Sequence, residues 1–206
     1  MPQDLQTRVD AIVIGASAGG VEALSILLPA LPAPLRAAVF IVLHLPRERP
    51  SLLVEIFAPK CAVPVREAED KVRVEPGTVY FAPADYHLLI DHGPQLALSI
   101  DDLVHCSRPS IDVLFESAAD VYAERLMGII LTGANDDGSA GLAAVKRSGG
   151  VTIVQDPDSA QLPLMILSAL KQSLPDFVLP LDKIAELLRT LASTDATTTR
   201  NVSRSK

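Results

Sequence analysis

Short apolar runs alternate with amphipathic stretches along most of the chain, and this alternation predicts strands separated by helices. AIVIG at residues 11–15 and AVFIVLH at residues 38–44 are continuous β-rich runs, while apolar positions in residues 21–28 recur at helical spacing. Continuous Val, Ile and Leu runs are typical of parallel strands that helices cover on both faces. This part of the chain therefore predicts a β-α-β unit.

The second half of the chain repeats this pattern. A helix is predicted from Ser110, with its apolar positions on one face at Ile111, Leu114, Ala118 and Val121. The strand RLMGIIL, a Gly/Asp/Asn loop, another helix and the strand VTIVQ follow, and a last helix covers about residues 182–191. Together the two halves predict an α/β fold, a doubly wound, mainly parallel sheet with helices on both faces.

Residues 63–100 have a different character. Pro-Gly and His-Gly-Pro turn signals separate short alternating segments there, which is typical of short strands and hairpins. We expect an antiparallel hairpin at one edge of the sheet. The histidines of this turn-rich section and the stretch after it, His87, His92 and His105, are expected at the surface.

Composition and charge narrow the class of protein. A chain of 206 residues predicts one domain, and a net charge of −7 without a basic stripe argues against nucleic-acid binding. No segment approaches the roughly 20 apolar residues of a membrane helix, so neither a targeting segment nor membrane insertion is expected. We expect a lead at residues 1–9, a domain at 10–192, a disordered tail at 193–206 and a cytoplasmic location.

The two cysteines and the histidines give no sign of a metal centre or a disulfide framework. Cys61 and Cys106 form no CxxC pair and are expected as reduced thiols. A zinc site from Cys106 and the surface histidines lacks the paired spacing that zinc ligands show. No cofactor is expected.

The loop Gly15-Ala16-Ser17-Ala18-Gly19-Gly20 follows a strand and opens a helix. A dinucleotide site would have glycine at position 17 and an acidic residue at the end of the second strand, where the chain has His44. The pattern G-x-S-x-G instead presents a serine hydroxyl beside backbone N–H groups at a helix N-terminus. Ser17 is therefore either a nucleophile or a helix cap.

A serine nucleophile needs a base and a carboxylate that orients it. His44 ends the strand that follows the Ser17 strand, and active sites of open α/β sheets gather at these carboxyl ends. The loop after the strand RLMGIIL supplies Asp136 and Asp137, which could also only cap the next helix. The order Ser, His, Asp differs from that of α/β-hydrolases, which disfavours that family.

Five segments resemble one known family in their order along the chain. VIGASAGGVEAL, VLHLP, REAEDKVRVEPGTVYFAPADYHL, SRPSIDVLF and GIILTGANDDGSAGL are together similar to the catalytic domain of chemotaxis protein-glutamate methylesterases, the CheB family. The likeness runs from about residue 10 to residue 190. It implies that Ser17 is the nucleophile, His44 the general base and Asp137, rather than Asp136, the orienting carboxylate.

The resemblance also implies a substrate and partners. The family hydrolyses glutamyl methyl esters on the cytoplasmic helices of methyl-accepting chemoreceptors, and some members deamidate receptor glutamines. A chemoreceptor or related signalling protein is the implied substrate, and a methyltransferase or a separate regulator is a further implied partner. The oxyanion would be received by backbone N–H groups, for which Ala18 and a residue near Ala134 are candidates.

Two departures from the family pattern leave alternatives open. The sequence begins almost at the first predicted strand, so we expect a stand-alone domain without the N-terminal receiver domain of other members. Met165-Ile166-Leu167 replaces the Met-Pro-Arg that is usual in the family, which would alter substrate docking. The alternatives are a non-catalytic signalling module that binds a receptor or methyltransferase, and an esterase or amidase for another acyl substrate.

Overall fold

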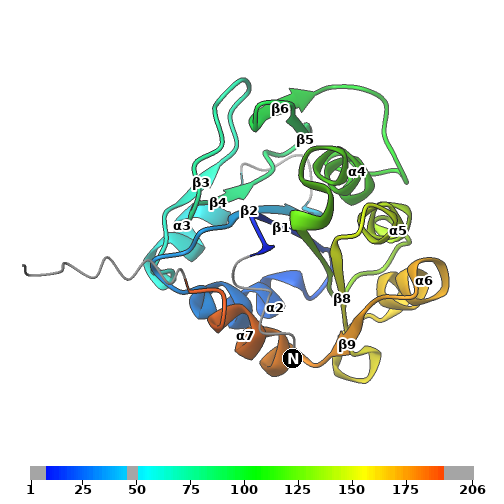
Figure 1. The fold of residues 1–206 in the computed structure, drawn as a ribbon. Helices are drawn as coiled ribbons and strands as arrows, with labels where there is room; N and C mark the ends of the chain where they lie inside the picture. The colour runs from blue at the N-terminus through cyan, green and yellow to red at the C-terminus, as the bar shows by residue number, and fades with distance from the viewer. Residues whose placement is uncertain (1–7, 46–50, 193–206) are drawn as a thin grey trace, which may run out of the picture.

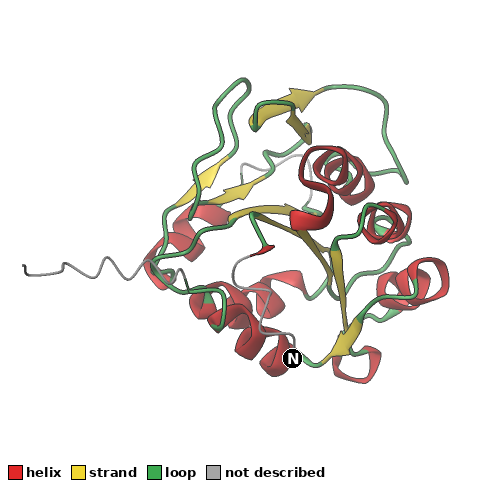
Figure 2. Cartoon of the chain, viewed as in Figure 1, coloured by secondary structure: helices red, strands yellow, loops and turns green. Residues whose placement is uncertain are grey.

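The central element is a parallel sheet built from the apolar runs. The computed structural model describes residues 8–45 and 51–192, and within them seven parallel strands are ordered β3-β4-β2-β1-β7-β8-β9 (Figures 1 and 2). The strands are β1 Ala11–Ala16, β2 Ala38–Leu43, β3 Val65–Glu67, β4 Val79–Phe81, β7 Leu126–Ile130, β8 Val151–Gln155 and β9 Phe177–Leu179. The predicted mainly parallel α/β fold is confirmed.

Helices cover both faces of this sheet. The α-helices are α2 Gly20–Leu27, α3 Leu53–Phe57, α4 Ile111–Tyr122, α5 Ser139–Arg147, α6 Leu164–Ser173 and α7 Leu181–Arg189. Short 3₁₀ helices are η1 Leu28–Ala30, η2 Ala58–Lys60, η3 Ala123–Arg125 and η4 Pro157–Ser159. Figure 1 shows α2 and α7 on one face and α4 and α5 on the other. No helix among the described residues is long and apolar enough to cross a bilayer.

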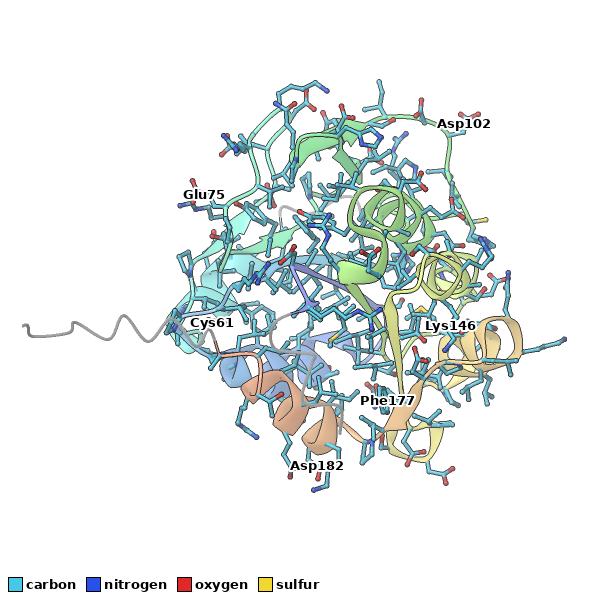
Figure 3. The ribbon with its side chains drawn as sticks, viewed as in Figure 1. Cys61, Glu75, Asp102, Lys146, Phe177 and Asp182 are labelled. Atoms are coloured by element: carbon cyan, nitrogen blue, oxygen red, sulfur yellow. The ribbon has the colours of Figure 1, made fainter. Side chains whose placement is uncertain are left out.

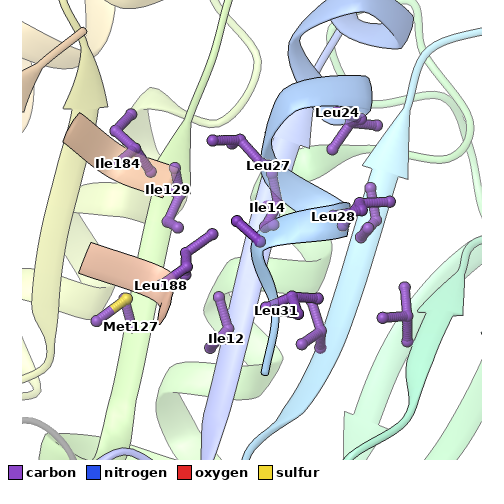
Figure 4. Close-up of a cluster of buried hydrophobic side chains, with 14 of the residues drawn as sticks. Ile12, Ile14, Leu24, Leu27, Leu28, Leu31, Met127, Ile129, Ile184 and Leu188 are labelled. Atoms are coloured by element: carbon purple, nitrogen blue, oxygen red, sulfur yellow. The ribbon is translucent and has the colours of Figure 1, made fainter. Parts of the chain in front are cut away.

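Alternation along the strands supplies two separate cores. Ile12 and Ile14 of β1 pack toward α2 and α7, whereas Val13 packs toward α4. All three side chains are fully buried. Figure 4 shows the first core, in which Leu27 of α2 and Leu188 of α7 lie over β1 and β7. Burial of each such side chain contributes about 1.5–3 kcal/mol, so both helix layers are held mainly by apolar contact.

The predicted hairpin is present, but it forms a sheet of its own. Strands β5 His87–Asp91 and β6 Gln95–Ser99 pair antiparallel and lie over α4 (Figure 1). Leu88, Ile90 and Leu96 are buried in the α4-side core, and the Ile90 N–H donates to Ser117 Oγ at 3.1 Å. The edge of the main sheet is instead β3, which pairs parallel with β4, and Val79 and Phe81 of β4 are buried in the core.

The other edge of the sheet is tied down by one carboxylate. Asp176 accepts hydrogen bonds from the N–H and the hydroxyl of Thr152 at 2.9 and 2.8 Å and pairs with Lys146 of α5. Burial would raise the pKa of Asp176, but Lys146 and Thr152 outweigh it and lower that pKa. Figure 3 shows Lys146 and Phe177 on the same side of the molecule. These contacts fasten the three-residue strand β9 to β8.

The structure describes only part of the predicted lead at residues 1–9 and none of the predicted tail at residues 193–206. Residues 1–7 of the lead and the whole tail lie outside the described residues. Val9 is already buried in the core, and Arg8 donates to the carbonyl of Gly149 at 2.6 Å. Cys61 and Cys106 form no disulfide.

Candidate active site

The ends of three neighbouring strands bring the predicted site residues together. Strand β1 lies between β2 and β7, so the chain order of the sheet reverses there, and ligand sites of open α/β sheets lie at such reversals. Ala16 pairs with Leu43 in the parallel register, so that Ser17 and His44 follow at adjacent positions. The Ser17 N–H donates to the Thr132 carbonyl at 3.0 Å, which fixes the Ser17 loop to the end of β7.

Close packing around Ser17 depends on two glycines. Gly19 has φ of 80°, a left-handed conformation that lets the chain turn from β1 into α2. A Cβ atom on Gly133 would lie 3.0 Å from Ser17 Cβ and 2.6 Å from Met165 Cε. A side chain at position 133 would require Met165 to shift and would crowd Ser17, which is half-buried at the carboxyl end of the central strand β1.

His44 contacts the predicted aspartate directly. Its Nε2 atom lies 3.0 Å from Asp137 Oδ2, and the two side chains are 13% and 0% exposed. The Asp136 side chain is 61% exposed and points elsewhere, toward His105 Nδ1 at 3.0 Å. The structure thus brings together Ser17, His44 and Asp137 and leaves Asp136 outside. Among the described residues, Ser17 Oγ forms no hydrogen bond with His44.

Asp137 is held by four donors. Its Oδ1 accepts from Ser110 Oγ at 2.8 Å and from the Asp112 N–H at 3.0 Å, and its Oδ2 accepts from the Ile111 N–H at 2.7 Å and from His44. Burial would raise the pKa of Asp137, but the hydrogen bonds from His44, Asp112 and Ile111 hold it below its usual range. The first turn of α4 therefore keeps this buried carboxylate ionised.

An ionised Asp137 accepts and does not donate, so the proton of its contact with His44 lies on Nε2. Nδ1 is then the ring nitrogen left to receive a proton. Asn135 Nδ2 lies 3.4 Å from this Nδ1, and Asn135 Oδ1 is buried with no hydrogen-bond partner in the described part of the chain. Neither Asn135 nor Ser110 was predicted as a site residue, although both lie within motifs that the sequence shares with the family.

Two backbone donors near Ser17 remain available. Ala18 and Ala134 are exposed, and within residues 8–45 and 51–192 the N–H of neither donates a hydrogen bond. An open pocket of about 80 Å³ lies beside His44 and is lined further by Leu45 and residues 106–109. The site thus has an open space beside His44 and, next to Ser17, N–H groups able to receive a negative oxygen.

The surface position expected for His87 is wrong. Its side chain is 1% exposed, because β5 and α4 enclose it. The Ser110 N–H donates to its Nδ1 at 3.1 Å, and its Nε2 donates to the Asp102 carbonyl at 3.1 Å. His87 therefore fixes the start of α4, whereas His92 and His105 are exposed as predicted.

Related proteins match most of this chain. A protein of Leptospira interrogans with the provisional name protein-glutamate methylesterase/protein-glutamine glutaminase is 46% identical over 178 residues, which are 86% of this chain and 92% of that protein. The protein-glutamate methylesterase/protein-glutamine glutaminase 2 of Methanosarcina mazei is 39% identical over 86% of this chain, which spans 50% of its length.

A solved structure and a family model agree with these relatives. The crystal structure of the Thermotoga maritima CheB methylesterase catalytic domain matches with a TM-score of 0.84 and 34% identity, over 89% of this chain and 99% of that domain. The model of the CheB methylesterase family matches residues 12–188. The chain therefore belongs to the CheB methylesterase family.

Proposed function

We propose that this chain is a protein-glutamate methylesterase in which Ser17 is the nucleophile, His44 the general base and Asp137 the orienting carboxylate. The observation that carries this is the 3.0 Å contact of His44 with the buried, ionised Asp137, at the strand end next to Ser17. The names of the relatives from Leptospira and Methanosarcina support the substrate. We assign the domain to residues 10–192.

In the proposed reaction, His44 Nδ1 takes the proton of Ser17 Oγ as this oxygen attacks the carbonyl carbon of a glutamyl methyl ester. The N–H groups of Ala18 and Ala134 receive the oxyanion. The bond from the carbonyl carbon to the methoxy oxygen breaks, and His44 returns its proton to that oxygen, so that methanol leaves. His44 then takes a proton from a water molecule whose oxygen attacks the acyl carbon, the bond from that carbon to Ser17 Oγ breaks, and His44 returns the proton to Ser17 Oγ, which leaves a glutamate side chain on the substrate protein.

Asp137 stabilises the positive charge on the His44 ring during both steps. Because its own pKa is lowered, it stays ionised and does not take the proton from Nε2. A glutamine side chain can follow the same route, with ammonia as the leaving group in place of methanol. This accounts for the second activity in the names of the relatives.

The proposed substrate is the cytoplasmic helical part of a methyl-accepting chemoreceptor or a related signalling protein, and the proposed location is the cytoplasm. A methyltransferase or a separate regulator is a further proposed partner. The support is the family to which the chain belongs.

The test is methanol release from a methylated chemoreceptor cytoplasmic fragment. We expect release by the unchanged chain and its loss, by a factor of at least about 10³, in Ser17→Ala. Ser25→Ala is the matched control, because Ser25 Oγ only donates to the Val21 carbonyl within α2. Equal release by the unchanged chain and Ser17→Ala would disprove the proposal. Fragment binding without release would indicate a non-catalytic signalling module.

A further inference from the structure

The segment before and at the start of α6 forms one flank of the Ser17 loop. The Leu162 carbonyl accepts from the Gly133 N–H at 2.9 Å and from the Thr132 hydroxyl at 3.2 Å. The Thr132 hydroxyl oxygen also accepts from the Leu162 N–H at 3.0 Å, and the Ala18 carbonyl, 3.0 Å away, is the alternative acceptor for its one hydrogen, so one side chain connects both segments. Whatever occupies the Ser17 site therefore lies next to the segment that begins α6.

This flank exposes three large apolar side chains. Leu162, Leu164 and Leu167 are 40%, 51% and 49% exposed, and we refer to them as the leucine patch. Met165 and Ile166 on the same turn are fully buried and already supply the contact of α6 with the core. The leucine patch is thus not needed for the packing of α6, and exposed apolar side chains that gather beside a site, as Leu164 and Leu167 do on one face of α6, are candidates for a binding surface.

The charge around the leucine patch also differs from that of the whole chain. Residues 160–175 contain no aspartate or glutamate and include one charged side chain, Lys171, whereas the chain carries a net charge of −7. An acidic partner would be repelled by much of this protein but not by this segment. Binding here would rest on apolar contact, with little dependence on salt.

We propose that the leucine patch is the docking surface for an amphipathic helix of the protein substrate, and this rests on the proposed function. The apolar side chains one turn away from the glutamyl ester would lie on the leucine patch while the ester reaches Ser17. Leu164 and Leu167 are three positions apart on α6, so they form a ridge that fits apolar positions i, i+3 and i+4 of a facing helix.

The test compares a protein substrate with a small one. The ratio of kcat/KM for a methylated receptor fragment to kcat/KM for p-nitrophenyl acetate is measured in Leu164→Gln, Leu167→Gln and the double variant. We expect this ratio to fall about tenfold for each leucine. Leu174→Gln is the matched control, because Leu174 is 78% exposed at the far end of α6, and its ratio should change less than about twofold.

Binding gives a second readout that does not depend on turnover. In the Ser17→Ala chain, the two leucine changes should raise the Kd for the receptor fragment at least about tenfold, with little change on adding salt. An unchanged Kd and an unchanged ratio would overturn the proposal, as would the absence of fragment binding. The proposal would also be overturned if the chain formed a dimer that the leucine changes abolish while the ratio of the two kcat/KM values stays the same. A second copy of the chain, and not a substrate helix, would then cover the leucine patch.

Failure of the proposed function would appear differently. The unchanged chain would then hydrolyse no receptor ester, whatever stands at positions 164 and 167, while the binding measurement would still report on the leucine patch.

Discussion

Two histidine–carboxylate pairs lie at the first turn of α4, and the pKa values of their carboxyl groups are shifted in opposite directions. His44 contacts Asp137 at 3.0 Å, and His105 contacts Asp112 at 3.3 Å. Both carboxylates are buried, yet the pKa of Asp137 is lowered, whereas burial raises the pKa of Asp112 to about 6. The two carboxylates lie at one helix turn, but their pKa values are shifted in opposite directions.

Hydrogen-bond donors explain this difference. Asp137 has two N–H groups, one hydroxyl and one imidazole, whereas Asp112 has the Gly141 N–H at 2.6 Å and the partly exposed His105. The negative charges of Asp137 and Glu116 also raise the pKa of Asp112. Burial alone therefore does not decide whether a carboxylate can orient a catalytic histidine; the donors around it decide.

The largest expected effect on turnover follows from removing the negative charge of Asp137 in the first pair. Asp137→Asn should lower methylesterase turnover about 10³–10⁴-fold, because an amide no longer holds the His44 ring with its proton on Nε2. The check is steady-state methanol release, with circular dichroism to show that the variant folds. A loss of less than tenfold would remove Asp137 from the proposed triad.

The raised pKa of Asp112 in the second pair should make the free energy of unfolding depend on pH. A carboxyl whose pKa is raised from 3.8 to about 6 on folding stabilises the folded chain most at low pH, and this contribution is lost as the pH rises through about 6. The loss amounts to about 3 kcal/mol. The free energy of unfolding of Asp112→Asn, measured with urea, should therefore rise by about that much relative to that of the unchanged chain between pH 4 and pH 7. A constant difference across this range would contradict the assignment.

Removing one donor should make Asp137 more like Asp112. Ser110→Ala deletes the hydroxyl that donates to Asp137 at 2.8 Å and that caps α4, at a cost of about 1–3 kcal/mol in unfolding free energy. The pKa of Asp137 should rise, so activity should be lost at a higher pH when the solution is acidified. The pH profile of kcat/KM measures the pH at which activity is lost. Ser110→Thr keeps a hydroxyl and should restore the profile of the unchanged chain.

The smallest effect is expected for Asp136, which contacts the other ring nitrogen of His105. Asp136→Asn removes a contact with His105 between two side chains that are 61% and 36% exposed. Such pairs contribute about 0–1 kcal/mol, so turnover and stability should change little. Turnover as low as that of Asp137→Asn would reverse the choice between the two aspartates.

Sequence patterns were sufficient for most of the sheet. The continuous runs predicted β1, β2, β7 and β8 because strands buried on both faces need apolar residues at every position. Strand β9 has only three residues, Phe177–Leu179, and offers too short a pattern. The partner of the β5–β6 hairpin was not predictable either, since alternation reveals a buried face but not the element that buries it.

The site was predictable in part for a similar reason. Strand ends located Ser17 and His44, and the family resemblance selected Asp137. The position of His87 was missed because a turn-rich composition does not reveal that α4 covers it. Asn135 was missed because only the fold brings its amide to His44.

The carboxylate that caps α4 also makes the site visible to spectroscopy. The amide protons of Ile111 and Asp112 point at the two oxygens of Asp137, so their chemical shifts must follow any change of charge or position of that carboxylate. Two backbone resonances thus report, in the free protein and without any substrate, whether the hydrolytic machinery is assembled. They would serve as a built-in signal when inhibitors or regulators of this protein are screened.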